Sequence, residues 1–195
     1  TELSAISSGT ERLFYRGQVP ANLAVDATIA GLEESFSYPL KYGYAAIGRV
    51  TSLGSQVDKA WLGQRVFAFH PHESHFLAFV DTLRPVPEGI LPQEAVLLPN
   101  METAVSFVMD GAPLMGERVT VFGQGVVGLL TTSLLSQFPL ESLTAVDSIE
   151  QRRRLSLQLG ATAACAPADL IAGHVTDADL VYELSGNPAA LDLAV

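Results

Sequence analysis

The second half of the chain alternates short apolar runs with helix-like segments. Four apolar runs predict strands, at residues 119–122, 143–146, 161–165 and 180–184. Strands buried on both faces of a parallel sheet have such continuous apolar runs, and helices cross between them. The pattern therefore predicts an α/β fold with a doubly wound parallel sheet. A full sheet of this kind has about six strands, so we expect this one to be incomplete.

The first half changes repeatedly between short apolar runs and glycine or proline breaks, which is typical of a compact and mostly β unit. Strands are expected at residues 46–51, 65–70 and 75–80, with turns at 42–44 and 52–55. Residues 84–89 contain two prolines, which fix φ and remove backbone donors. We expect that segment to be an extended crossover and not a strand.

Two helices are expected between these halves. Pro92 suits the first turn of a short helix. A second helix is expected over residues 101–109, with Gly111 as its stop. Four apolar side chains would share one face of it: Ala104, Val105, Val108 and Met109.

The change of pattern near residue 100 predicts two domains, at residues 1–100 and 101–195. The chain opens at Thr1 without an initiator methionine and stops at Val195 within a helical pattern. We therefore expect the first domain to be truncated at its N-terminus and the second domain to be partial.

Composition and charge exclude several classes of partner. The chain has 195 residues, 48% of them apolar, which is enough for a packed core. The net charge of −10 argues against nucleic acid or an anionic membrane, because both need basic patches. No apolar stretch is long enough to span a bilayer, and no secretory signal is visible. The single cysteine, Cys165, excludes an internal disulfide and suits a cytoplasmic protein.

Three glycines at G-x-G-x-x-G spacing follow the predicted strand at 119–122 and precede a helix-like segment. Gly123 would permit a tight turn, and Gly125 would let the backbone approach a pyrophosphate. Gly128 would let the helix pack closely on the sheet. The pyrophosphate would meet the positive end of that helix. The motif therefore predicts a dinucleotide-binding site.

Asp147 ends the next predicted strand and follows Gly128 by 19 residues. An acid at roughly this interval hydrogen-bonds the ribose hydroxyls of a dinucleotide and repels the 2′-phosphate of NADP. We therefore expect NAD as the cofactor. NADP stays open as the alternative, because Arg152, Arg153 and Arg154 follow closely, although a helix would carry them onto a solvated face.

The order of several short motifs resembles that of the medium-chain dehydrogenase/reductase superfamily, which includes zinc-type alcohol dehydrogenases and quinone oxidoreductases. The matching landmarks are Ser8–Gly9–Thr10–Glu11, Tyr42–Gly43–Tyr44, Gly48–Arg49–Val50, Gly63–Gln64–Arg65–Val66, Pro85–Val86–Pro87–Glu88–Gly89, Met101–Glu102–Thr103–Ala104 and the glycine motif. The resemblance implies a GroES-like β domain that shapes a substrate pocket. It also implies a Rossmann domain that binds a nicotinamide cofactor.

The zinc-dependent members of that superfamily carry metal ligands at positions where this chain has Ser8, Tyr44 with Ala45, and Pro99. None of these side chains is a good zinc ligand. The cysteine-rich lobe that holds a structural zinc is replaced by the short segment 70–75. The chain therefore resembles a branch without zinc, in which hydrogen-bond donors would stabilise charge on a carbonyl oxygen.

The resemblance suggests Thr10, Tyr44 and His70 as catalytic residues. Thr10 matches a position that relays the substrate proton, Tyr44 occupies a former ligand position, and His70 aligns with a pocket-lining position. Plainer interpretations remain open for all three: Thr10 could bond its local backbone, Tyr44 could be a core aromatic, and His70 could lie in a solvated loop. The residues expected at the cofactor are Thr103, Gly123, Gln124, Gly125, Val126, Val127, Gly128, Asp147 and Arg152.

These features predict an NAD(P)-dependent, zinc-independent oxidoreductase that moves a hydride between nicotinamide and a carbonyl, an alcohol or an activated alkene of a small molecule. A homodimer is possible in this superfamily. One alternative is a protein on the same fold that binds or senses NAD without catalysis. Another is a zinc enzyme that uses His70, His72 and His75, although Pro71 disrupts their alternation and a solvated loop is the plainer interpretation.

Overall fold

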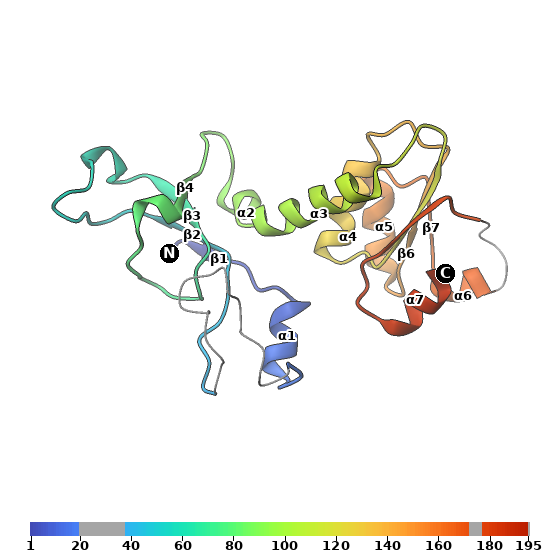
Figure 1. Ribbon diagram of the computed structural model, residues 1–195, viewed down its shortest axis with the longest axis horizontal. Coiled ribbons are helices and arrows are strands. Elements are labelled where there is room, and N and C mark those ends of the chain that lie inside the picture. Colours follow the sequence, from blue (N-terminus) through green and yellow to red (C-terminus); the bar gives the residue numbers. More distant parts are fainter. Residues whose placement is uncertain (20–37, 172–176, 195) are drawn as a thin grey trace. The chain divides into compact units, whose positions relative to one another are not determined.

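The computed structural model describes residues 1–19, 38–171 and 177–194. The chain forms two compact units, Thr1–Pro99 and Asn100–Val195 (Figure 1). Each unit has its own sheet and its own apolar core. No helix in these described ranges is both long enough and apolar enough to cross a bilayer.

The first unit contains a four-stranded antiparallel sheet in the order β1-β2-β3-β4. The strands are β1 (Leu3–Ser4), β2 (Ala46–Arg49), β3 (Arg65–Ala68) and β4 (Leu83–Pro85). Ile47 of β2 lies opposite Phe67 of β3, and both side chains are buried. With Ala45 and Val96 they form the core of this unit, so apolar burial fixes the register of the central pair.

The first unit also contains four short helices among its described residues: α1 (Thr10–Tyr15), η1 (Lys59–Trp61), η2 (Val80–Thr82) and α2 (Pro92–Ala95). The sequence pattern did not predict α1. Glu11 in its first turn accepts a hydrogen bond from the backbone N–H of Ser7, which satisfies one donor at the helix start. Phe14 is buried and its ring centroid lies 4.2 Å from that of Tyr42, which anchors the helix.

Two predictions for the first unit are wrong. Residues 75–79 form no strand, and Leu77 and Phe79 are exposed at 99% and 82%, because the ladder of β3 is completed by a later segment. That segment is β4, which occupies part of the predicted crossover. Pro85 ends β4, and the ladder continues through the backbone N–H of Val86, which donates to Arg65. A proline is tolerated at such a strand end on the sheet edge.

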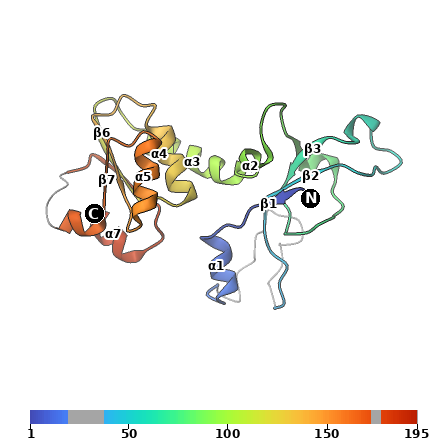
Figure 2. The same ribbon diagram turned by 180° about the vertical axis from the view of Figure 1, so that it is seen from behind.

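The second unit is a parallel sheet in the order β7-β6-β5-β8. Its strands are β5 (Arg118–Phe122), β6 (Ser142–Val146), β7 (Ala163–Cys165) and β8 (Leu180–Glu183). Its helices are α3 (Leu98–Gly111), α4 (Val126–Leu135), α5 (Glu150–Gln158), α6 (Pro167–Ile171) and α7 (Pro188–Ala194). Helices α4 and α5 lie side by side against the sheet (Figure 2). The predicted α/β fold with a parallel sheet is confirmed.

The strands of the second unit follow the apolar runs to within one or two residues, but the apolar face of α3 differs from the prediction. Ala104 and Val108 are buried, as expected. Val105 and Met109 are exposed at 39% and 72%. The core packs against only one row of the helix, because residues four apart stack on the same side and the neighbouring row turns away from it.

Candidate functional site

The turn between β5 and α4 depends on two glycines. Gly123 has a φ of +83°, in the left-handed region that favours glycine. A Cβ at Gly123 would also lie 2.5 Å from the backbone N and Cα of Ser185, which follows β8. A Cβ at Gly128 would overlap the carbonyl oxygen of Gly123. The turn is therefore closed on one side by the end of β8 and on the other by the first turn of α4. The sequence predicted close approach of Gly128 to the sheet, whereas its nearest neighbour is the turn itself.

Gly125 differs from these two glycines, because nothing lies within 4 Å of the position where its Cβ would be. Its φ of −73° is one that any residue adopts, so the fold of this chain does not itself require a glycine here. Gly125 is also the N-cap of α4 and supplies no capping side chain. The first N–H groups of a helix have no partner within the helix. Open space thus adjoins backbone donors at a helix N-terminus, an arrangement that suits an anion.

Gln124 lies between these glycines and is fully buried. Its side-chain N–H donates to the Val121 carbonyl at 3.1 Å, and its side-chain oxygen accepts from the Thr132 hydroxyl at 3.0 Å. Its backbone N–H donates to Asp147 Oδ2 at 2.7 Å. The side chain of Gln124 therefore ties the turn to β5 and α4. The glycine spacing gives no signal for this network.

Asp147 follows β6 directly and is 7% exposed. Besides the bond from Gln124, its Oδ1 accepts from the backbone N–H of Ile149 at 2.8 Å. Arg152 lies 3.6 Å from Oδ2, and Arg153 donates to the Asp147 carbonyl at 2.7 Å. Because β5 and β6 are adjacent and parallel, their carboxyl ends bring Asp147 beside the glycine turn, as the motif implied. The sequence placed all the arginines on a solvated face, whereas Arg153 is half-buried.

The remaining cofactor candidates lie on two helices. Val126 and Val127 form the first turn of α4, and Val126 is 45% exposed. Thr103 is an exposed residue of α3.

The three candidate catalytic residues lie on three segments of the first unit. Thr10 is the first residue of α1 and is exposed. Tyr44 is half-buried just before β2 and packs against the apolar core of this unit. The His70 ring stacks on Phe76, with centroids 3.7 Å apart, and its Nδ1 lies 3.0 Å from the Pro71 carbonyl oxygen.

Charged groups also lie beside His70. Glu73 Oε2 is 3.6 Å from His70 Nδ1. Lys41 hydrogen-bonds the carboxylate of Glu73 and holds its pKa below the usual value. His70 therefore lies beside an acid that stays ionised at neutral pH.

His72 and Glu11 form a pair that sequence reasoning missed. His72 Nε2 lies 2.9 Å from Glu11 Oε2, and the residues are 61 positions apart. Both side chains are partly buried, at 29% and 14% exposure. The one indirect signal in the sequence is the glycine at position 43. Gly43 has a φ of +120°, and a Cβ there would lie 2.6 Å from the His72 ring, so a larger residue would not fit.

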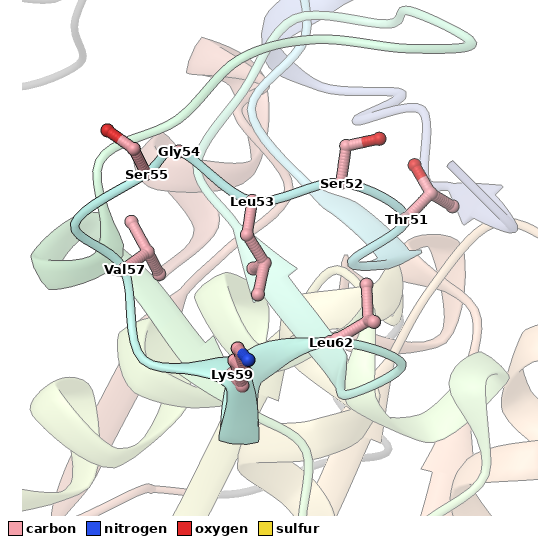
Figure 3. Close-up of a pocket in the computed structure, with 8 residues that line it drawn as sticks. All are labelled: Thr51, Ser52, Leu53, Gly54, Ser55, Val57, Lys59 and Leu62. Carbon is pink, nitrogen blue, oxygen red and sulfur yellow. The ribbon is translucent and has the colours of Figure 1, made fainter.

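The first unit also contains a pocket of about 550 Å³ in the loop after β2 (Figure 3). Its lining residues are Thr51, Ser52, Leu53, Gly54, Ser55, Val57, Lys59 and Leu62. None of the candidate catalytic or cofactor residues lines it. Throughout the described part of the chain, no three His, Cys, Asp or Glu side chains gather closely enough to hold a metal ion. The histidine-cluster alternative therefore gains no support from the described residues.

The comparisons with known proteins confirm the resemblance to the medium-chain dehydrogenase/reductase superfamily. No protein-family model matches the chain. Two curated relatives, from Aspergillus terreus and Aspergillus clavatus, carry the name "Probable D-xylulose reductase A". They are 29% and 35% identical over 80% and 74% of this chain, and over 53% and 49% of their own lengths. The chain thus spans about half the length of the curated relatives it matches.

Solved structures show the same fold. An alcohol dehydrogenase from a Thermus species matches 96% of this chain and 63% of its own, with a TM-score of 0.66 and 19% identity. A quinone oxidoreductase from Thermus thermophilus, also solved with NADPH, is 26% identical over 78% of this chain and 51% of its own, with a TM-score of 0.60. An E. coli alcohol dehydrogenase complexed with NADH covers 78% of this chain and 56% of its own, at a TM-score of 0.64 and 19% identity.

Proposed function

We propose that the protein is a nicotinamide-dependent oxidoreductase that acts on a small alcohol or carbonyl compound. The observation that carries this proposal is the open space at Gly125, beside the N-terminus of α4. Gly123 and Gly128 are accounted for by contacts within the fold, whereas Gly125 leaves room that a Cβ would fill. A pyrophosphate suits this cradle because it is anionic and approaches the backbone closely. Solved neighbours that hold NADH or NADPH support the same assignment.

NAD is the cofactor we propose in preference to NADP. Each carboxylate oxygen of Asp147 accepts one backbone hydrogen bond and has a further lone pair for a ribose hydroxyl. A 2′-phosphate in that place would be repelled by the carboxylate. Arg152 partly offsets this repulsion, because its guanidinium lies 3.6 Å from Asp147 and its side chain is 45% exposed.

Thr10, Tyr44 and His70 are proposed to orient the substrate and to exchange its proton. A bound nicotinamide would supply or accept the hydride. A hydroxyl, phenol or imidazole next to the substrate oxygen stabilises its charge by hydrogen bonding and can carry a proton. With Nδ1 of His70 near the Pro71 carbonyl oxygen, Nε2 is the nitrogen proposed to face the substrate.

Zinc independence and substrate class belong to the same proposal. Ser8, Tyr44, Ala45 and Pro99 stand where the superfamily's zinc enzymes carry ligands, and none is a good zinc ligand. Relatives named D-xylulose reductase and sorbitol dehydrogenase favour a sugar alcohol or its ketose. The homodimer and the cytoplasmic location expected from the sequence stay predictions.

Three measurements on the intact protein test this function. Calorimetry with NADH and NADPH should show binding, with NADH the tighter ligand. Turnover should then be assayed with D-xylulose plus NADH and with sorbitol plus NAD. Metal analysis should find no stoichiometric zinc in the active preparation. Absence of binding heat with both cofactors would overturn the proposal.

A second candidate is a protein that binds NAD without catalysis. The replacement of the zinc-ligand positions favours it, because a dehydrogenase that lost its metal ligands could keep the nucleotide fold. This candidate predicts cofactor binding without turnover of any alcohol, aldehyde, ketone or quinone. Turnover that is abolished by changing Tyr44 and His70 together would decide for the enzyme.

A further inference from the structure

His72 contacts two segments of the first unit that are far apart in sequence. Its ring Nε2 lies 2.9 Å from Glu11 in the first turn of α1. Its backbone N–H donates to the Tyr42 carbonyl at 3.0 Å. Its ring also lies against Gly43, where a Cβ would come within 2.6 Å of it. One histidine thus joins α1, the segment before β2 and its own loop.

These three segments carry the three candidate catalytic residues. Thr10 directly precedes Glu11, and Tyr44 directly follows Gly43. His70 lies two residues before His72 in the same loop. A displacement of His72 would therefore be transmitted to all three segments at once.

We infer that His72 is a positioning residue that, together with Glu11, holds the segments of Thr10, Tyr44 and His70 in one arrangement for the proposed oxidoreductase reaction. The inference rests on the proposed function. His72 itself is not assigned a contact with substrate, because its second ring nitrogen, Nδ1, is buried.

The chemistry of the ring supports a role of this kind. With the Glu11 carboxylate as acceptor, Nε2 of the imidazole carries a proton. Nδ1 is buried and has no hydrogen-bond partner within the structure described. An unpaired buried polar atom costs stability, so a carbon atom at that place would serve the fold better. The contacts that explain an imidazole at this position are the hydrogen bond to Glu11 and the close packing over Gly43.

Variants at position 72 separate the effect of the hydrogen bond to Glu11 from the effect of ring packing. His72→Phe keeps a planar ring but removes the donor to Glu11. His72→Gln keeps an amide donor close to the position of Nε2 and removes the unpaired Nδ1. His75→Phe is the matched control, because His75 is an exposed histidine of the same loop.

We expect His72→Phe to lower kcat/KM roughly 10- to 100-fold, since a displacement of about 1 Å at reacting groups has effects of this size. The Kd for NADH, measured by calorimetry, should stay unchanged. His72→Gln should recover most of the activity, and His75→Phe should match the wild-type protein. Glu11→Ala should resemble His72→Phe, and the double variant should lose no more than either single variant if the two residues act through each other.

Two readouts do not depend on activity. Nitrogen-15 NMR should show the His72 proton on Nε2 at neutral pH. Amide hydrogen exchange at Ser7 and His72 should accelerate in His72→Phe and not in His72→Gln, with the melting temperature reported alongside. Unchanged exchange, an Nε2 without a proton, or additive losses in the double variant would overturn the inference.

The outcomes also separate this inference from the function on which it rests. If wild-type protein binds NADH and turns over a substrate, and His72→Phe keeps that turnover, the positioning role is wrong and the function stands. If the wild-type protein shows no turnover, the proposed function fails, and the positioning role fails with it.

Discussion

The glycine turn of the second unit and the group of contacts around His72 in the first unit are built in opposite ways. The turn is made of main chain, and its shape depends on a positive φ at Gly123 and on the absence of a Cβ at Gly128. The cluster around His72 is made of side chains from three separate segments. A main-chain site leaves its signature in consecutive residues. A side-chain site exists only after distant segments have packed.

The two regions therefore should respond differently to substitution. In the turn, an added side chain should either destabilise the fold or enter the space proposed for the cofactor, depending on the glycine chosen. In the cluster, loss of a contact should leave the fold in place and change the geometry of three segments. The predictions below begin with the change expected to have the largest effect.

Gly128→Ala should have the largest effect. Its Cβ would overlap the carbonyl oxygen of Gly123, which belongs to the backbone and cannot rotate aside. Overpacking of this kind costs about 1–3 kcal/mol, and the turn would also lose its shape. Chemical denaturation should show the destabilisation, and NADH binding should be lost. A variant as stable as the wild-type protein would show that the turn is not closed by α4.

Gly125→Leu should abolish cofactor binding while the fold survives. Nothing lies within 4 Å of its Cβ position, so the first added carbon has room, and the loss of glycine at the N-cap of α4 should lower the free energy of unfolding by only about 1 kcal/mol. The new side chain would fill the space proposed for the pyrophosphate, and NADH affinity should fall at least roughly tenfold. Gly125→Ala is the smaller companion, expected to weaken binding less. Unchanged affinity in Gly125→Leu would refute the proposed cradle.

Asp147→Ser should shift the preference between cofactors. Loss of the carboxylate removes the repulsion of a 2′-phosphate and leaves Arg152 beside the site. Calorimetry should show weaker NADH binding and stronger NADPH binding, with the ratio of the two Kd values changed roughly tenfold. In the double variant Asp147→Ser with Arg152→Ala, the affinity for NADPH should fall back toward that of the wild-type protein. An unchanged ratio in Asp147→Ser would place the ribose elsewhere.

The Arg118–Asp179 pair at the start of β5 should give the smallest effect. Hydrogen bonds from Arg118 lower the pKa of Asp179 to about 2. Because this pKa lies below the value of about 3.9 in an unfolded chain, the pair stabilises the fold above about pH 4, and the contribution is lost as the pH falls toward 2. Asp179→Asn should lower the urea midpoint slightly at pH 7 and leave it unchanged below pH 2, whereas Asp192→Asn should change neither. An exposed pair is weak, so high salt should reduce the difference.

The sequence predicted most of the second unit, because continuous apolar runs between helix-like segments are typical of buried parallel strands. The placement of Asp147 beside the turn also followed, since adjacent parallel strands end at the same edge. The first unit was harder. Its strands are only two to four residues long, and β4 lies in a segment where prolines argued against a strand.

The contact between Glu11 and His72 was beyond sequence reasoning, because 61 residues separate them and neither stands in a recognisable pattern with the other. Gln124 gives the same lesson on a smaller scale. A glutamine between two glycines suggests a polar side chain at the ligand, whereas the fold buries it against Val121 and Thr132. The spacing of glycines indicates where the backbone turns. Whether a side chain in the turn faces a ligand or bonds within the fold depends on how it is buried.

Asp147 also fastens the glycine turn, since its Oδ2 accepts the backbone N–H of Gln124. The carboxylate is thus the ribose-binding group that we propose, and it also holds the glycine turn in place through a hydrogen bond. During evolution, a change of coenzyme preference at this position would loosen the loop in the same step. A substitution at the exposed neighbour Arg152 would instead leave this hydrogen bond in place.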